Sequence, residues 1–516
     1  MKFLKITKRI INTCANSRQN VLTVLSDEPT PSLEEWESAI PYENVPGPTP
    51  IPLLGNTWRF IPFIGDFQTE HIDKVSKKLH EKYGKIVKME GLLGRPDMLF
   101  LFDPDEIEKV FRQEDSLPFR PSMPSLNYYK HVYRKEFFGD NNCGVIAVHG
   151  EKWQDFRSRV NQIMLQPRVT KMYVKSITAT SQELVDRIEA IKNEDDEVPE
   201  DFLNEVHKWS LESIAKIALD VRLGCLDRDA HPDTQRLIDA VHTFFMLVPV
   251  LELKIPFWRL WSTPTFKTYL RALDTIREIT LKHIDIALHK LDKQDNQELS
   301  VLQRVLKMDN NVKTASNLAL DMFLVGIDTT SNAVASILYQ LSLHQEKQAN
   351  LYDEVKKLLP DSDTELTHEK LDRMQYLKAC VKETMRMYPV VIGNGRCTTS
   401  DRVIGGYQIP KGIQVIFQHC VISNLEDYFP RCNEFLPERW LKTSDLCKSH
   451  HPFASLPFGF GKRMCLGRRF ADLEIQTVLA KIISNYKIEY HYEKLDYYIH
   501  PMYTPNGPLK LKFIKR

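Results

Sequence analysis

The chain has 516 residues, 42% of them hydrophobic, and its 69 Lys and Arg nearly balance its 68 Asp and Glu, which leaves a formal net charge of +1. A chain with so little net charge has no global electrostatic footprint for nucleic acid, so none is expected as a partner. The length would allow several domains, but no flexible linker, long charge block or internal repeat marks a boundary, and one large folded unit is therefore expected.

The first 26 residues, MKFLKITKRIINTCANSRQNVLTVLS, contain basic residues and no acid. Phe3, Ile6 and Ile10 fall near one face of a helix, with lysines beside them. The segment has no apolar run of about 18 residues, so we expect neither a membrane span nor a secretory signal. A basic, amphipathic start is typical of a mitochondrial transit peptide, and residues 1–41 are predicted to be a leader. A disordered basic tail is the alternative.

Prolines occupy every second position from Pro46 to Pro52 in YENVPGPTPIPLLGN, residues 42–56. Because each proline lacks an N–H donor, neither a helix nor a central strand fits this stretch. We therefore expect a stiff, extended entrance to a globular body that spans residues 42–516.

Helical periodicity dominates that body, and the strand patterns are short. HIDKVSKKLHEKYG, residues 71–84, is periodic and ends at a glycine, as helices often do. Short β patterns occur within residues 84–102 and 403–418. The predicted fold class is mainly α with a small β region (α+β), in a single large domain.

EKWQDFR places Trp153 and Arg157 four residues apart, on one face of a helix. By itself, this pair is equally consistent with a core tryptophan beside a surface arginine. Further along, residues 242–261 form a long apolar and aromatic run that Pro249 and Pro256 interrupt. This run is either core or a patch that dips into a membrane to admit lipophilic molecules, and we favour the patch.

Residues 315–360 are apolar for most of their first half and then become amphipathic. The first part is too apolar for a surface helix and contains Asp321 and Asp328, so we expect a long buried helix. Asp328 and Thr329, in VGIDTTS, are costly there unless they take part in chemistry or find partners. A structural role, in which Thr329 bonds back to a carbonyl one turn earlier, is compatible with such a function.

KETMR puts Glu383 and Arg386 on one helical face, and FLPERW supplies Arg439. Alone, the Glu–Arg pair is a weak signal, because such pairs are common on solvated helix faces. YLKACVKETMR also puts Lys378 and Lys382 four residues apart. A solvated basic face is the plain interpretation of these two lysines.

The nine cysteines are scattered, without a CxxC pair or a zinc-type Cys/His spacing, which favours reduced thiols in a non-oxidising compartment. One of them, Cys465, lies within PFGFGKRMCLGRRF. Gly459 and Gly461 would allow a tight turn that aims backbone N–H groups at its sulfur, and Gly467 would let the following helix approach a flat partner. Arg463 would meet an anionic edge of that partner.

A thiolate, a flat ring and an anionic edge together describe haem. A nucleophilic cysteine with a distant histidine is the alternative, but it leaves the glycines unexplained.

The stretch FGFGKRMCLG resembles the haem-binding signature F-x-x-G-x-R-x-C-x-G of the cytochromes P450. Its fixed positions are filled by Phe458, Gly461, Arg463, Cys465 and Gly467. The resemblance covers the chain from about Tyr42 onward and is closest to mitochondrial, insect-like members of the family. It implies a mostly helical triangular prism with haem b as cofactor, and Cys465 as the axial ligand of the iron.

The resemblance also implies roles for the other motifs. A charge network behind the haem would consist of Glu383, Arg386 and Arg439. The propionates would be held by Trp153, Arg157, Arg396 and Arg463. Thr329 would hydrogen-bond dioxygen at the iron, and Asp328 would help to bring protons from water. A ferredoxin would dock on Lys378, Lys382, Arg468 and Arg469.

The sequence thus predicts a haem-thiolate monooxygenase that inserts one atom of O2 into a lipophilic xenobiotic or steroid-like molecule. Electrons would come from NADPH through ferredoxin reductase and an adrenodoxin-like 2Fe–2S ferredoxin. The expected location is the matrix side of the mitochondrial inner membrane, with peripheral membrane contact. The alternatives are a haem-thiolate isomerase or dehydratase without external electrons, which the intact GIDTT disfavours, and a haem-based ligand sensor, in which the basic residues near Cys465 would be idle.

Overall fold

The computed structural model describes residues 30–120, 123–139, 144–291, 299–361, 364–448, 450–499 and 502–516. Most of the predicted leader, residues 1–41, lies outside the described residues. Its last part forms helix α2 (Leu33–Ser38), and Ile40 then makes a parallel bridge with Tyr407. The chain is therefore joined to the folded body before residue 42.

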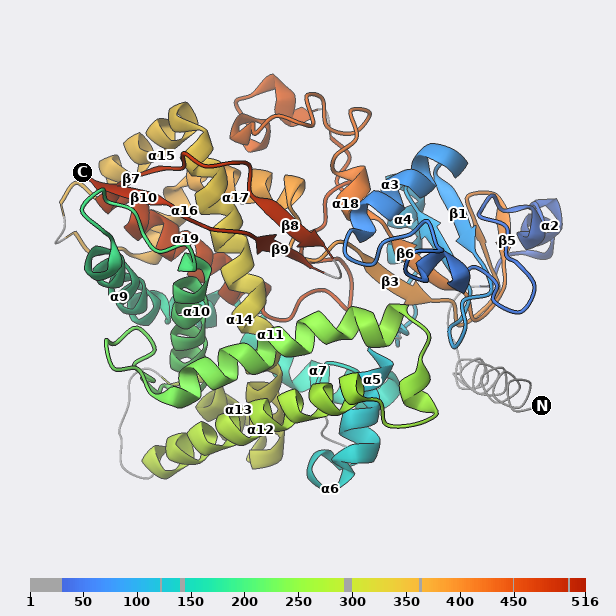
Figure 1. Cartoon of the computed structure of the whole chain (residues 1–516), viewed down its shortest axis with the longest axis horizontal. Coiled ribbons are helices and arrows are strands. Elements are labelled where there is room, and N and C mark those ends of the chain that lie inside the picture. The colour runs from blue at the N-terminus through green and yellow to red at the C-terminus, as the bar shows by residue number, and fades with distance from the viewer. Residues whose placement is uncertain are drawn as a thin grey trace.

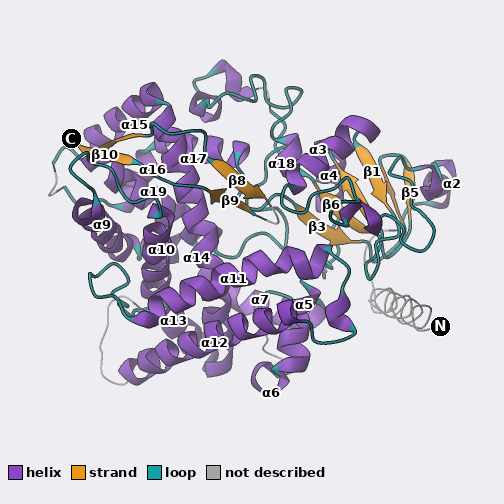
Figure 2. Ribbon diagram, in the orientation of Figure 1, coloured by secondary structure: helices purple, strands orange, loops and turns teal. Residues whose placement is uncertain are grey.

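Helices make up most of the described structure, and most strands gather at one side of it (Figures 1 and 2). The helices from α3 to α13 are α3 (Ile72–Tyr83), α4 (Pro104–Arg112), α5 (Pro124–Tyr128), α6 (Lys135–Phe138), α7 (Gly150–Met164), α8 (Pro167–Lys171), α9 (Val174–Ile191), α10 (Phe202–Leu219), α11 (Pro232–Leu253), α12 (Pro264–Leu291) and α13 (Val301–Asp309). The later helices are α14 (Val312–Leu343), α15 (Gln345–Leu358), α16 (His368–Arg373), α17 (Gln375–Met387), α18 (His419–Ile422) and α19 (Arg468–Asn485).

Helix α14 is the central helix of this body, and it packs against α10, α11, α12, α13 and α19. Among the described residues it has the length and apolar composition of a membrane span, but most of it is buried inside the protein, as in the core helix of a globular fold. The buried helix expected within residues 315–360 is therefore present. It is shorter than that range, because α14 ends at Leu343 and α15 begins at Gln345.

Pro249 does not interrupt the apolar run of residues 242–261, contrary to the expectation from sequence, because α11 continues through it to Leu253. A proline inside a helix removes one backbone hydrogen bond. Here α11 packs along α12 and α14, and this contact compensates for the missing bond. Pro256, by contrast, does mark a break, since it precedes the short 3-10 turn Phe257–Arg259.

The largest sheet has the strand order β1-β2-β6-β3. Its strands are β1 (Ile86–Met89), β2 (Met98–Leu101), β3 (Asn394–Cys397) and β6 (Gln414–Phe417). The β1–β2 and β3–β6 pairs are antiparallel, whereas β2 and β6 are parallel, with Leu99 opposite Val415. This parallel pair joins the two segments that the sequence predicts to contain strands.

Three two-stranded antiparallel sheets complete the β structure of the described chain. Their strands are β4 (Arg402–Ile404) with β5 (Tyr407–Ile409), β7 (Tyr486–Glu489) with β10 (Lys512–Lys515), and β8 (Asp496–Ile499) with β9 (Tyr503–Asn506). The predicted class, mainly α with a small β region in a single domain, is confirmed.

Candidate functional site

Cys465 lies in a tight turn just before α19, as the glycine pattern predicts. Its backbone N–H donates to the carbonyl oxygen of Phe458 (2.9 Å), and the N–H of Met464 donates to the carbonyl of Gly461 (3.1 Å). Gly459 and Gly461 have φ angles of 69° and 75°, in the left-handed region where a side chain is strained. The turn therefore requires glycine at both positions.

Cys465 is the exposed member of the free cysteines in the described chain, whereas Cys225, Cys380, Cys397, Cys420 and Cys432 are buried. Although Cys465 is accessible, the dense protein around it raises the pKa of the thiol by desolvation. The N–H of Gly467 and the positive charges of Arg157 and Arg120 oppose this shift, because they stabilise the thiolate. The sulfur thus has both an open face and several groups that favour its anionic form.

Gly467 indicates what lies against that open face. Its φ of −84° is ordinary, and a Cβ added there would meet no protein atom within 4 Å. Neither backbone strain nor packing within the chain therefore requires a glycine at this position. A flat group pressed against the start of α19 would require one.

Two of the predicted arginines reach the cysteine turn from α7 and from the turn itself. Arg157, on α7, donates from Nη2 to the carbonyl of Met464 (2.8 Å). Arg463 donates from Nε to the carbonyl of Pro118 (3.0 Å) and from Nη1 to a second backbone carbonyl (3.1 Å). The guanidinium of Arg463 also lies 3.5 Å from the centre of the Trp153 ring, one helical turn before Arg157. Trp153, Arg157 and Arg463 are therefore close together.

Arg396, on β3, lies in the same cluster and pairs with an acid. Its Nε and Nη2 atoms lie 2.6 Å and 2.5 Å from Oε1 of Glu114. Burial and repulsion from Arg120, Arg396 and Arg157 lower the pKa of Arg463 to about 8, and Glu114 opposes that shift. We call Arg120, Arg157, Arg396 and Arg463 the arginine cluster.

Several polar atoms of this region are buried without a partner in the described part of the chain. Among the described residues, Nε of Arg157, Nη2 of Arg463 and Nδ1 of His149 have no hydrogen-bond partner. Burial and the charges of Arg463 and Arg120 also lower the pKa of His149 to about 3, so that His149 is neutral. A buried polar group left unpaired costs about 1–3 kcal/mol, and more when it is charged. A site that concentrates cations and leaves their donors unpaired is suited to an anionic ligand.

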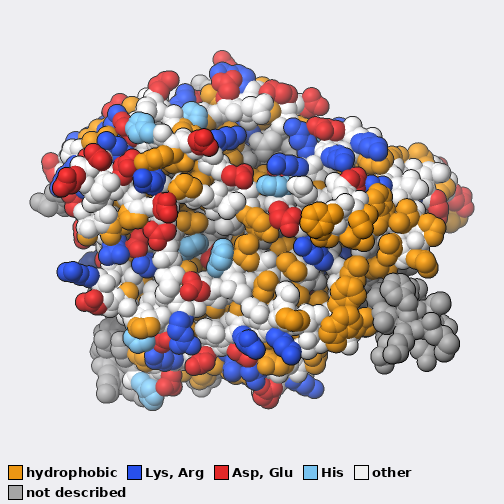
Figure 3. Space-filling view, in the orientation of Figure 1, with side chains coloured by type: hydrophobic (Ala, Val, Ile, Leu, Met, Phe, Trp, Pro, Cys, Tyr) orange, Lys and Arg blue, Asp and Glu red, His pale blue; other side chains and the backbone are white. Residues whose placement is uncertain are grey.

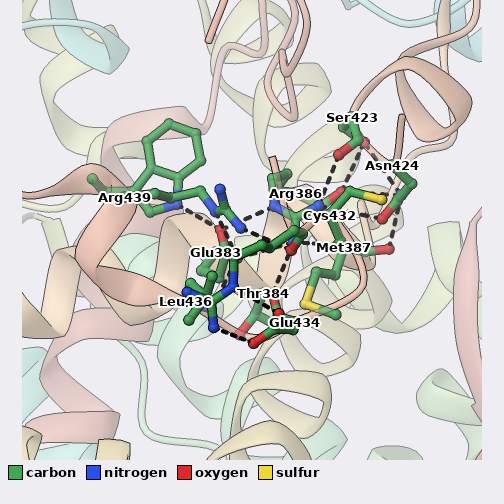
Figure 4. A network of polar contacts seen from close by, with 12 residues as sticks. Glu383, Thr384, Arg386, Met387, Ser423, Asn424, Cys432, Glu434, Leu436 and Arg439 are labelled. Carbon is green, nitrogen blue, oxygen red and sulfur yellow. Dashed lines mark hydrogen bonds and ion pairs between the residues drawn. The ribbon is translucent and has the colours of Figure 1, made fainter. Parts of the chain in front are cut away.

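Glu383, Arg386 and Arg439 meet in a fully buried network (Figure 4). Arg386 donates from Nε and Nη2 to the two carboxylate oxygens of Glu383 (3.0 Å and 2.9 Å). Arg439 donates to Oε1 of Glu383 (3.0 Å), and the indole N–H of Trp440 donates to Oε2 (2.9 Å). The remaining Arg386 donors reach backbone carbonyls, including that of Ser423 (2.8 Å). The structure thus brings the three predicted residues together with their polar groups paired.

Asp328 and Thr329 lie side by side in α14. Thr329 Oγ1 donates to the carbonyl of Val325 (2.7 Å), the back-bond that the sequence allows. The Asp328 side chain is 2% exposed, and its Oδ1 has no hydrogen-bond partner among the described residues. Burial raises the pKa of Asp328 to about 7. Near neutral pH its carboxyl is therefore divided between the protonated and charged forms, as suits a group that transfers protons.

The predicted basic residues converge around Asp472 of α19. The four cations are Lys378, Lys382, Arg468 and Arg469. Burial raises the pKa of the Asp472 carboxyl, and these cations oppose the rise. Lys382, Arg468 and Arg469 are exposed, whereas Lys378 is half-buried and donates to the carbonyl of Asp372 (2.9 Å). Lys378 Nζ also lies 3.5 Å from Oδ1 of Asp372. The four cations outnumber these two acids and leave a positive surface, which we call the basic face.

Comparison with known proteins identifies the family. Residues 45–513 match the family model described as "Cytochrome P450". The chain belongs to the cytochrome P450 family. It is therefore a haem-dependent oxidoreductase of the monooxygenase type.

Three similar proteins of this family come from Drosophila melanogaster. The chain is 48% identical to "Probable cytochrome P450 301a1, mitochondrial", over 94% of this chain and 89% of that protein. It is 44% identical to "Probable cytochrome P450 49a1", over 100% and 89% respectively. It is 38% identical to "Probable cytochrome P450 12a5, mitochondrial", over 93% and 92%.

The haem of a cytochrome P450 is a flat ring that carries two carboxylates, and the residues around Cys465 fit such a group. The unpaired donors of Arg157 and Arg463 and the surplus of positive charge in the arginine cluster suit the carboxylates. The glycine at position 467, which the chain's own packing does not require, suits the flat ring. Cys465 lies between Arg463 and Gly467 in the sequence. Its accessible sulfur interacts with the charges of Arg157 and Arg120 and with the N–H of Gly467.

Arg120, Glu114 and His149 also lie at this site, although no sequence motif predicts them. Arg120 and Glu114 follow α4 in an irregular segment, and His149 immediately precedes α7. None of them lies at a fixed spacing from Cys465, so no local pattern marks them. An acid such as Glu114 could have been expected on electrostatic grounds, because three predicted arginines in one buried site require a nearby counter-charge.

Proposed function

We propose that this cytochrome P450 is a mitochondrial monooxygenase that inserts one atom of O2 into a lipophilic small molecule. The observation that carries the proposal is the pairing of an accessible Cys465, beside the charges of Arg157 and Arg120, with a cluster of buried, incompletely paired arginines. The names of two similar proteins, which include the word mitochondrial, support the location. The matrix side of the inner membrane is the proposed place.

Haem b is the proposed cofactor, and Cys465 would bind its iron through sulfur. When bound, the haem supplies the site at which O2 is reduced and split, and thiolate ligation favours cleavage of the O–O bond. Arg157, Arg463 and Trp153 would hold the propionates, together with Arg396. Phe458, Gly461 and Gly467 would shape the turn and the face against which the ring lies.

Thr329 and Asp328 would hold and transfer the protons that the reaction needs. Thr329 holds its hydroxyl proton on the carbonyl of Val325, and rotation about χ1 would redirect this donor toward the reacting oxygen. Asp328, with its pKa raised to about 7 by burial, can both accept and release a proton near neutral pH. Thr329 and Asp328 therefore supply, at consecutive positions, a hydrogen-bond donor and a carboxyl group that can take up and release a proton.

Electrons would arrive from an adrenodoxin-like 2Fe–2S ferredoxin, which ferredoxin reductase charges from NADPH. The basic face lies beside the helix that begins just after Cys465, and its cations outnumber the two acids among them. Such a face attracts an acidic protein and weakens its hold as ionic strength rises. Lys382 also lies 5.7 Å from the Trp440 ring, whose N–H bonds to Glu383, so the face adjoins the buried charge network.

Lipophilic substrates would enter from a membrane that the protein touches peripherally. Large apolar side chains are exposed at Leu53, Phe63, Ile64, Phe257 and Trp261. The segment that contains Phe257 adjoins the loop near Gly94, since Arg259 donates to the Gly94 carbonyl (3.0 Å). Figure 3 shows hydrophobic side chains gathered over the side of the molecule that holds the β1–β6 region. Both a xenobiotic and a steroid-like molecule suit this route.

Reconstitution tests the proposed reaction. The purified holoenzyme is mixed with ferredoxin, ferredoxin reductase and NADPH under labelled O2, with candidate substrates chosen by their shift of the haem spectrum. We expect steady NADPH consumption and a product that contains one labelled oxygen atom. Product without NADPH would instead indicate an isomerase or dehydratase. Failure of every donor to reduce the haem would indicate a ligand sensor.

Charge reversal tests the docking face. The double variant Lys378→Glu with Lys382→Glu should raise the KM for ferredoxin about tenfold or more, because two attractive charges become repulsive. Haem content should not change. The matched control is Lys74→Glu with Lys78→Glu, which has the same i,i+4 spacing on α3. Equal effects of the two double variants, at low and high salt, would place the docking face elsewhere.

A further inference from the structure

Asp328 is buried in α14, yet two histidines from other helices approach its carboxylate. His207 Nδ1, from α10, lies 3.7 Å from Oδ1. His242 Nδ1, from α11, lies 4.0 Å from Oδ2. Both helices pack against α14, and α11 crosses it in Figure 1. A histidine therefore faces each carboxylate oxygen of Asp328, the residue proposed to hold the proton.

His207 is fixed as a neutral donor. The hydroxyl of Ser331 lies 2.6 Å from both the carbonyl of Ile327 and Nδ1 of His207. Because a hydroxyl has a single proton and the carbonyl can only accept, Ser331 donates to Ile327 and accepts from Nδ1–H of His207. Burial lowers the pKa of His207 to about 3, so this imidazole stays neutral. The Nδ1–H of His207 is thus engaged with Ser331, and this neutral imidazole does not supply a proton to Asp328.

His242 has a different environment. Its side chain is 49% exposed, whereas the Asp328 side chain is 2% exposed, so one imidazole touches both solvent and the surroundings of the buried acid. At 4.0 Å the two groups are not hydrogen-bonded, and a small rotation of the ring or one bridging water closes the gap. Histidine exchanges protons with water near neutral pH through either ring nitrogen.

We propose that His242 is the residue through which protons pass from solvent to Asp328. In one transfer, a hydronium ion from solvent protonates Nε2 of neutral His242 and leaves as water, and Nδ1–H then gives its proton to the Asp328 carboxylate. The imidazole is left neutral with its proton on Nε2, and exchange with water returns the proton to Nδ1. His242 acts through Asp328, so it is a positioning residue of the relay, and this role rests on the proposed monooxygenase function.

The charged surroundings of this pair are limited to a few groups in the described chain. His207 faces Asp328 from α10, and His242 faces it from α11. Asp239, one turn before His242 on α11, acts on the His242 imidazole and favours its charged form, whereas burial lowers its pKa. His207 and His242 repel each other when charged. Any pH dependence of the relay therefore reports on these groups.

The first test measures the contact without turnover. Histidine-labelled holoenzyme in the reduced, carbon-monoxide form is titrated by NMR, in the wild type and in Asp328→Asn. Asp328 titrates near pH 7, above the range in which His242 titrates, so contact between the two groups should give the His242 signals a second inflection near pH 7 that Asp328→Asn removes. Asp285→Asn, which removes a carboxylate on α12 beside His289, is the control and should leave His242 unchanged. Identical His242 titrations in the wild type and Asp328→Asn would overturn the proposal.

The second test measures proton delivery in the reconstituted enzyme. His242→Phe and His242→Gln should both lower product formed per NADPH about tenfold and release peroxide instead, with a larger solvent isotope effect. His289→Phe, at an exposed histidine on α12, should behave as the wild type. Normal coupling in His242→Gln would show that the residue only fills space, and it would overturn the proposal.

These readouts separate the two proposals. A wild type that forms no oxygenated product refutes the proposed function, while the NMR titration still decides whether His242 and Asp328 interact. A wild type that oxygenates its substrate with unaffected His242 variants refutes the relay alone. Both variants should keep the reduced carbon-monoxide spectrum of the wild type, because neither touches the haem ligand.

Discussion

The buried charge network and the arginine cluster both take guanidinium groups out of water, but they do so with opposite outcomes. In the network, Glu383 is bonded by two arginines and one indole, and the spare donors reach backbone carbonyls. In the arginine cluster, Glu114 acts on Arg120, Arg396 and Arg463, and donors of Arg157 and Arg463 stay unpaired among the described residues. The pKa of Arg463 falls to about 8 as a result.

This contrast separates scaffold from binding site. A buried charge with all its partners within the chain stabilises one arrangement of the segments that carry it. A buried charge with missing partners makes the protein less stable until a ligand supplies them. The network therefore holds the fold behind the cysteine turn, and the cluster receives an anion.

The largest expected effect comes from breaking the network. Glu383→Gln should lower the free energy of unfolding by about 3–5 kcal/mol, because two buried guanidinium groups lose their counter-charge. Denaturant unfolding measures the change. The matched control is Glu434→Gln, which breaks the exposed i,i+3 pair with Arg431 and should cost at most about 1 kcal/mol. A similar loss of unfolding free energy in the two variants would mean that the buried network stabilises the fold no more than an exposed ion pair does.

The arginine cluster should respond in the opposite way. Arg120→Gln removes one of the mutually repelling cations, so the haem-free protein should be at least as stable as the wild type. Haem binding should weaken about 10- to 100-fold, since a charge-assisted hydrogen bond to the ligand is lost. Haem transfer to a strong acceptor measures the affinity. Arg112→Gln, at the exposed end of α4, is the control. A less stable haem-free protein with unchanged haem affinity would make Arg120 part of the scaffold.

Asp328 is a third case, a buried acid that pairs with no Lys or Arg of the described chain. Burial raises its pKa from 3.8 to about 7, so the folded protein keeps a proton that the unfolded chain releases as pH rises through this range. Wild-type stability therefore falls with rising pH relative to Asp328→Asn. The advantage of Asp328→Asn should grow by about 1 kcal/mol between pH 6 and pH 8. Denaturant unfolding at both pH values measures it, with Asp239→Asn as an exposed control. A constant difference would contradict the raised pKa.

Local motifs predict those parts of the site that lie close together in the chain. Glu383 and Arg386 share a helix face, and the cysteine turn depends on glycines within a few residues, so both are readable from sequence. Glu114 meets Arg396 across 282 positions, and no spacing rule connects them. Residues brought together by such long-range folding are invisible to a local pattern.

The fold shows the same limit. Period and composition predict the helical body, the buried central helix and the short strands. They do not predict that β2 pairs in parallel with β6, because this register is set by the packing of segments some three hundred positions apart. For a related reason, the sequence wrongly predicts a break at Pro249. The tertiary contacts of α11 outweigh one missing hydrogen bond, so the helix continues through this proline.

The reduced carbon-monoxide spectrum tests the central claim most directly, namely that the sulfur of Cys465 holds the haem iron. The wild type should show the band that thiolate ligation produces, and Cys465→Ala should lose it. Cys420→Ala, at a buried cysteine outside the cluster, should retain it. A Cys465→Ala protein with an unchanged band would contradict the account, because the iron would then have another thiolate ligand.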